Sequence, residues 1–125
     1  MENASRKQTI LVVDDLETIP AFLCEFLEAA GYQVLSAPNG TEALDVAKKF
    51  RGVIDLLLTD LLMSGMHGFT LAELLLKERP RMRVLLISGE GPHGSFPTEQ
   101  ARNQLFLQKP FAADKLRAKV AEALS

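Results

Sequence analysis

The segment Val53–Asp60 reads VIDLLLTD, a nearly unbroken apolar run that ends on a carboxylate. A strand with apolar side chains on both faces is typical of a parallel sheet that helices cover on both sides. Four other short runs alternate with longer stretches along the chain. These runs are Ile10–Val13, Tyr32–Ala37, Val84–Ile87 and Leu105–Leu107.

The stretches between the runs carry apolar residues at the helical period. In the first, Pro20 suits the first turn and Gly31 the C-terminal end. Asn39 predicts the N-cap of the second helix, which Gly52 ends. The apolar faces comprise Ile19, Phe22, Leu23, Phe26, Leu27 and Ala30, then Ala43, Leu44, Ala47 and Phe50, then Leu71, Leu74 and Leu75, and finally Leu116, Val120 and Leu124.

Glycine and proline mark the remaining connections. Gly65 and Gly68 predict a loop before the third helix, which stops near Pro80. Residues 89–97 hold three glycines and two prolines, so we expect a loop there. Only a short or poorly formed helix is expected around residues 98–103.

The alternation amounts to five β–α units, and right-handed crossovers place helices on both faces of one sheet. We therefore expect an α/β fold with a doubly wound, five-stranded parallel sheet. The length of 125 residues and the 47% hydrophobic content fit one domain. Residues 1–8 are predicted to be a flexible N-terminal tail and residues 9–125 the domain.

The composition excludes several classes of partner. The net charge is −2, from 14 basic and 16 acidic residues, so we expect no direct binding of nucleic acid. No tract approaches the roughly 20 apolar residues that cross a bilayer, and the polar N-terminus does not resemble a signal peptide. Cys24 is the only cysteine and cannot form an internal disulfide, which favours a cytoplasmic location.

Polar residues follow the apolar runs directly. Asp14 and Asp15 end the first run, Asp60 the third, Ser88 the fourth, and Lys109 follows the fifth. In open α/β sheets, ligands bind outside the carboxyl ends of the strands. The sequence thus predicts three carboxylates, a hydroxyl and an ammonium group around one point.

This combination of groups favours phosphoryl chemistry. Three carboxylates in one cleft repel each other, and a hard cation with oxygen ligands, Mg²⁺, relieves the repulsion. A doubly charged phosphoryl group then suits the site. Lys109 would neutralise one phosphoryl oxygen and Ser88 would donate a hydrogen bond to another. Asp60 can be the nucleophile, because carboxylates form acyl phosphates.

Four motifs at these positions resemble those of response-regulator receiver domains, such as chemotaxis regulators. They read LVVDD at 11–15, LLTD at 57–60, ISG at 87–89 and FLQKPF at 106–111. The resemblance runs from about Thr9 to Leu124. It implies the (βα)5 fold with the flavodoxin-like strand order 2-1-3-4-5.

The resemblance implies roles for the acidic residues. Asp60 matches the phosphoacceptor, which also binds the metal. Asp15 matches the direct carboxylate ligand of Mg²⁺, and Asp14 the partner that acts through water. The backbone carbonyl of Leu62 matches a further metal ligand. The expected cofactor is Mg²⁺, with Mn²⁺ as an acceptable substitute.

The remaining matches concern the switch. Ser88 matches the switch hydroxyl and Lys109 the lysine that binds phosphate. Pro110 matches the proline after a cis peptide bond. Phe106 matches the aromatic residue whose rotation accompanies activation, and Gly68 the glycine eight positions after the acceptor.

The implied function is that of a phosphoryl-accepting domain in a two-component system or phosphorelay. The expected donor is a histidine kinase or a histidine phosphotransfer protein. The domain would catalyse its own phosphorylation and a slow autodephosphorylation, without being a conventional enzyme. The partner that recognises the phosphorylated domain would be a downstream protein or an output domain outside this sequence. We expect a monomer or weak dimer.

Two other functions compete with this interpretation. A receiver-fold interaction module could work without phosphorylation, although the acidic cluster and Lys109 argue against it. A phosphatase with an aspartate nucleophile usually has a second aspartate two positions later, where this chain has Leu62.

Several other residues that could carry chemistry are interpreted as ordinary surface or packing residues. His67 and His93 are expected to be solvated surface histidines, and Cys24 a small, partly buried side chain. The basic stretch that contains Lys77, Arg79, Arg81 and Arg83 is interpreted as a solvated helix end and turn, with partner docking as the less favoured interpretation.

Overall fold

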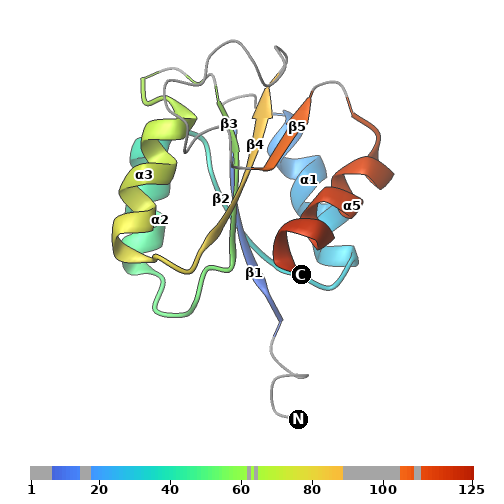
Figure 1. Cartoon of the computed structure of the whole chain (residues 1–125), viewed down its shortest axis with the longest axis horizontal. Helices are drawn as coiled ribbons and strands as arrows, with labels where there is room; N and C mark the ends of the chain where they lie inside the picture. The colour runs from blue at the N-terminus through green and yellow to red at the C-terminus, as the bar shows by residue number, and fades with distance from the viewer. Residues whose placement is uncertain (1–6, 15–17, 62, 64, 89–104, 109–110) are drawn as a thin grey trace.

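The fold is a five-stranded parallel sheet in the order β2-β1-β3-β4-β5, which confirms the predicted order. A computed structural model describes residues 7–14, 18–61, 63, 65–88, 105–108 and 111–125 (Figure 1). Its elements are β1 (Thr9–Val13), α1 (Thr18–Ala29), β2 (Gln33–Ala37), α2 (Gly40–Lys49), β3 (Leu56–Asp60), α3 (Gly68–Glu78), β4 (Arg83–Ser88), β5 (Leu105–Gln108) and α5 (Ala113–Leu124).

The helices cover the sheet from both sides. In Figure 1, α2 and α3 lie on one face, and α1 and α5 lie on the other. The strands are parallel throughout, so all of their carboxyl ends lie at one edge of the sheet. The fourth predicted helix, around residues 98–103, and the loop before it lie outside the described residues.

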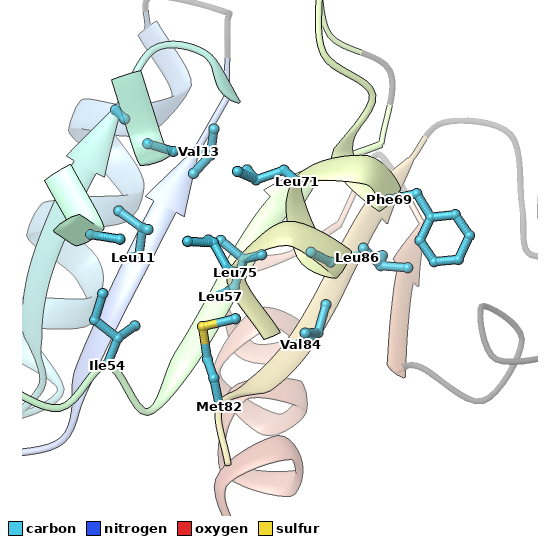
Figure 2. Close-up of a cluster of buried hydrophobic side chains, with 14 of the residues drawn as sticks. Leu11, Val13, Ile54, Leu57, Phe69, Leu71, Leu75, Met82, Val84 and Leu86 are labelled. Atoms are coloured by element: carbon cyan, nitrogen blue, oxygen red, sulfur yellow. The ribbon is translucent and has the colours of Figure 1, made fainter. Parts of the chain in front are cut away.

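The unbroken apolar runs are explained by two separate hydrophobic layers. Side chains alternate between the faces of a strand, so Leu11 and Val13 pack under α2 and α3 while Ile10 and Val12 pack under α1 and α5. In β3, Leu57 belongs to the first layer and Leu58 to the second. Figure 2 shows the first layer, where side chains from β1, β3 and β4 meet those of α3.

Two predicted helix boundaries are confirmed by their capping geometry. The Asn39 side chain accepts a hydrogen bond of 2.8 Å from the backbone N–H of Glu42, so Asn39 is the N-cap of α2. Gly31 follows the end of α1 with a φ of 105°, a conformation that favours glycine.

The end of α2 differs from the prediction, since the helix stops at Lys49 rather than at Gly52. The physical reason is Arg79, whose guanidinium donates hydrogen bonds of 2.9 Å to the carbonyls of Ala47, Phe50 and Gly52. These bonds satisfy carbonyls that a helix end leaves without a partner. The interpretation of Arg79 as a solvated side chain was therefore wrong.

Two further boundaries are corrected. The ladder of β3 begins at Leu56, and Val53 lies in the preceding connection with 56% of its surface exposed. Gly68, predicted to lie in a loop, is the first residue of α3. It is buried against the backbone of Asp60 and Leu61, and a side chain would not fit there.

Candidate functional site

The predicted site lies at the carboxyl edge of the sheet, and the strand register shows how its parts align. Val13 pairs with Thr59, so Asp14, which follows β1, and Asp60, the last residue of β3, lie at the ends of two neighbouring strands. Asp60 pairs with Ile87, and Ser88 is the last residue of β4. Three of the predicted positions thus lie at the ends of three consecutive strands.

Both described carboxylates of the site are buried. Asp14 is 2% exposed and Asp60 is 6% exposed, whereas the other described aspartates, at positions 45, 55 and 114, are exposed or half-buried. Burial of a carboxylate is costly unless charged or hydrogen-bonding groups compensate for it. Two such groups at adjacent strand ends therefore indicate a functional site.

The backbone around Asp60 is held on both sides. The N–H of Leu61 donates to the carbonyl of Ile87 at 2.8 Å, which extends the contact of β3 with β4 past Asp60. The carbonyl of Leu61 accepts from the N–H of Gly68, also at 2.8 Å. The hydrogen bond between Gly68 and Leu61 therefore holds the first residue of α3 next to the end of β3.

Sequence reasoning missed a supporting role of Thr59. This residue is fully buried, and its hydroxyl donates a hydrogen bond of 3.0 Å to the backbone carbonyl of Asp60. The same hydroxyl lies 4.0 Å from the sulfur of Met63. The available sequence pattern was a polar residue inside an otherwise apolar strand, which by itself did not indicate this hydrogen bond.

His67 also has a role that the sequence did not suggest. It is half-buried, and its Nδ1 accepts a hydrogen bond of 3.1 Å from the backbone N–H of Phe69. It is the N-cap of α3, so the interpretation as a solvated surface histidine was wrong. The sequence pattern that could have indicated this capping role is the position of His67 directly before Gly68, the first residue of α3.

Substitution of His67 by alanine is expected to destabilise the fold by about 1 kcal/mol, because the N-terminal turn of α3 loses its cap. His67→Asp should be at least as stable as the parent, since aspartate is a better N-cap and its charge suits a helix N-terminus. Urea unfolding of the three proteins measures this. A stability of His67→Asp below that of His67→Ala would contradict the capping role.

The other predicted residues divide into two groups. Phe106 pairs with Leu86 in the register of β4 and β5 and is half-buried against the layer under α2 and α3. The predicted residues at positions 15, 62, 109 and 110 lie outside the described residues. For Ser88 the structure describes the backbone, which belongs to β4 and pairs with Gln108 of β5.

The described donor set fits a hard divalent cation. Asp14 and Asp60 supply carboxylate oxygens at neighbouring positions of one edge, which is the ligand type that Mg²⁺ prefers. No group of three or more histidine, cysteine, aspartate or glutamate side chains suited to a metal occurs among the residues that the structure describes. The third predicted carboxylate, Asp15, lies outside them.

Cys24 is half-buried on α1, as predicted. Burial raises the pKa of its thiol above the ordinary value, and the nearby charge of Glu28 acts in the same direction, while a hydrogen bond with Ser36 opposes the shift. The thiol form is therefore favoured at neutral pH, and thiolate chemistry is suppressed. None of the described helices is long and apolar enough to span a membrane.

Comparison with known proteins gives a match over most of the chain. The family model described as "Response regulator receiver domain" matches residues 10–121. Sporulation initiation phosphotransferase F of Bacillus subtilis is 31% identical over 118 residues, which cover 94% of each protein. The sensor kinase CckA of Brucella abortus is 31% identical over 121 residues, or 96% of this chain.

The chain spans only 13% of the length of that kinase, far less than the whole relative. A solved structure is similar over nearly its full length: the response regulator protein TrrA of Thermotoga maritima, in complex with Mg²⁺ and BeF. The TM-score is 0.78 and the identity 33%, with 94% of this chain and 99% of the other covered.

Proposed function

Since this chain belongs to the response regulator receiver domain family, we propose that Asp60 is the residue that accepts the phosphoryl group. The chain is a phosphoryl-accepting receiver domain of two-component signalling. The observation that carries the assignment is the burial of Asp60 at the end of β3, beside the equally buried Asp14 at the end of β1. Figure 1 places this edge of the sheet at the top.

The proposed reaction is an in-line transfer. A carboxylate oxygen of Asp60 forms a bond to phosphorus while the bond from phosphorus to the donor's imidazole nitrogen breaks, and that nitrogen keeps the electron pair. Asp14, Asp15, Asp60 and the backbone carbonyl of Leu62 would hold Mg²⁺. Bound Mg²⁺ would supply positive charge that offsets the carboxylates and the phosphoryl oxygens.

The remaining predicted residues would receive and report the phosphoryl group. The Lys109 ammonium would neutralise one phosphoryl oxygen, and the Ser88 hydroxyl would donate a hydrogen bond to another. Phe106 would then move and change the surface that a partner reads. Pro110 would follow a cis peptide bond. The phosphoryl group thus favours one of two packings of the same chain.

We extend the proposal to the setting of the domain. Receiver domains interact with histidine kinases or phosphotransfer proteins, and the cognate donor of this chain would be one of these. Residues 9–125 would form the working domain, as a monomer or weak dimer. Mn²⁺ should replace Mg²⁺. The lone Cys24 supports a cytoplasmic location.

Incubation with acetyl phosphate and Mg²⁺ is expected to add one phosphoryl group per chain, and a chelator of divalent cations should abolish the uptake. Intact-protein mass spectrometry measures the product. Mg²⁺ at about 100 times its Kd should also stabilise the fold by roughly 2.7 kcal/mol in thermal unfolding. An absence of both uptake and Mg²⁺ binding would instead favour an interaction module that works without phosphorylation.

A further inference from the structure

A shallow pocket of about 490 Å³ lies at the edge of the sheet opposite Asp60. It is formed by two connections that enter neighbouring strands, residues 51–55 before β3 and residues 79–82 before β4. The first of these connections is visible at the lower edge of Figure 1. The pocket is therefore separated from the phosphorylation site by the length of the strands.

Positive charge surrounds this pocket. Arg51, Arg79 and Arg81 line it, and Asp55 is the one acidic residue among its lining side chains. The Asp55 carboxylate already accepts a hydrogen bond of 2.7 Å from the backbone N–H of Thr9. Arg51 and Arg81 are exposed, and neither forms an ion pair within the part of the chain that the structure describes.

Arg79 gives the pocket a rigid wall. Its guanidinium is fixed by three backbone carbonyls, which are neutral groups and leave its formal charge in place. A fixed charge attracts an anion without the loss of side-chain entropy that a mobile arginine pays on binding. The two exposed arginines beside it, Arg51 and Arg81, can adapt to the position of the incoming group.

The pocket also has an apolar part. Val53 is 56% exposed and is one of two large hydrophobic residues that are exposed in the described ranges. Ile54 and Met82 also line the pocket, and Figure 2 shows both at the lower end of the core layer. An apolar side chain placed on Val53 would therefore rest on a packed surface rather than over a void.

We propose that this pocket is a docking surface for an acidic protein segment that carries an apolar side chain between its carboxylates. Arginine matches carboxylates in charge and in the geometry of its hydrogen bonds, and Val53 would accept the apolar group. The net charge of −2 disfavours a nucleic acid, whose phosphates require a broad basic field. Because the pocket lies at the opposite edge, docking leaves the phosphorylation site accessible and does not depend on its state.

The test uses the whole chain and a fluorescein-labelled synthetic peptide that alternates glutamate and leucine. Fluorescence anisotropy should show binding that weakens with salt, and amide chemical shifts should change mainly in residues 51–55 and 79–82. A lysine–leucine peptide should bind at least about tenfold more weakly. Treatment with Mg²⁺ and beryllofluoride should leave the affinity for the acidic peptide unchanged.

Charge reversal of the two exposed arginines supplies the decisive variant. Arg51→Glu with Arg81→Glu should weaken peptide binding at least about tenfold, and Val53→Ser should weaken it roughly threefold. The matched control, Lys115→Glu with Arg117→Glu, makes the same change in net charge on exposed positions of α5 and should bind like the parent.

Three outcomes would overturn the proposal. One is equal weakening by the control pair, which would indicate a general charge effect. Another is polyuridylate or phosphatidylglycerol vesicles binding to the same residues as tightly as the acidic peptide, which would indicate an unselective surface for polyanions. The third is shift changes confined to other elements. Each of these readouts is independent of phosphoryl uptake at Asp60.

Discussion

Replacement of Asp60 by asparagine is expected to reduce phosphoryl uptake from acetyl phosphate at least about 1,000-fold, because an amide cannot form the acyl phosphate. The substitution keeps the shape of a side chain that is 6% exposed, so the fold should persist. Removal of one of two buried negative charges at neighbouring strand ends should also raise the melting temperature of the metal-free protein. Intact mass and differential scanning calorimetry measure the two effects.

Asp55→Asn is the matched control for this variant. Asp55 precedes β3 at the opposite edge of the sheet, and an asparagine oxygen can still accept the hydrogen bond from Thr9. Its phosphoryl uptake should equal that of the parent. Uptake by Asp60→Asn at the parental rate would show that another residue is the acceptor.

Gly68→Ala is expected to lower the free energy of unfolding by about 1–3 kcal/mol, which corresponds to a decrease in melting temperature of roughly 5–10 °C. A Cβ atom at this position would overlap the carbonyl oxygen of Asp60 and lie 3.0 Å from both the carbonyl carbon of Asp60 and the Cα of Leu61. These are backbone atoms of Asp60 and Leu61, so relief of the overlap must displace them.

The displacement predicts a second loss, in chemistry. A shift of about 1 Å in a reacting group can cost about 100-fold in rate, so phosphoryl uptake by Gly68→Ala should slow by at least about tenfold. Stopped-flow or quenched mass measurements with acetyl phosphate would determine this rate.

Gly65→Ala separates the two effects. Gly65 has a φ of 86°, so alanine there is strained and should also destabilise the fold, by about 1 kcal/mol. A Cβ at Gly65 meets no atom within 4 Å, however, so Asp60 stays in place. Its uptake rate should match the parent's, and an equal slowing in both variants would contradict the positional argument.

The fold could be predicted from the sequence because the apolar residues follow two clear patterns. They form short continuous runs in the strands, and they recur at the helical period in the stretches between the strands. Runs such as Ile10–Val13 have apolar side chains on both faces, and the structure places these faces in two layers. The errors occurred where a distant residue decided the outcome. Arg79 ends α2 through carbonyls that lie between 27 and 32 residues earlier in the chain, and no local pattern contains such a contact.

The charged residues of the site could be predicted from the sequence, whereas the residues that hold the surrounding backbone in place could not. Asp14 and Asp60 stand out because each comes at the end of an apolar run, where a carboxylate has no role in packing. Thr59 and His67 support the same site through single hydrogen bonds to backbone atoms. Threonine in a strand and histidine in a loop are common in other settings, so their residue types alone did not indicate these bonds.

The division of the core into two layers bears on how the proposed switch communicates. Asp60 follows Leu58 by two positions in β3, so its side chain lies on the face of the sheet that α1 and α5 cover. Phe106 packs on the opposite face, under α2 and α3. In the proposed switch, a response that begins at Asp60 and ends at Phe106 would therefore cross from one hydrophobic layer of the core to the other, and the carboxyl ends of the strands, where Ser88 lies, would be the place where it crosses.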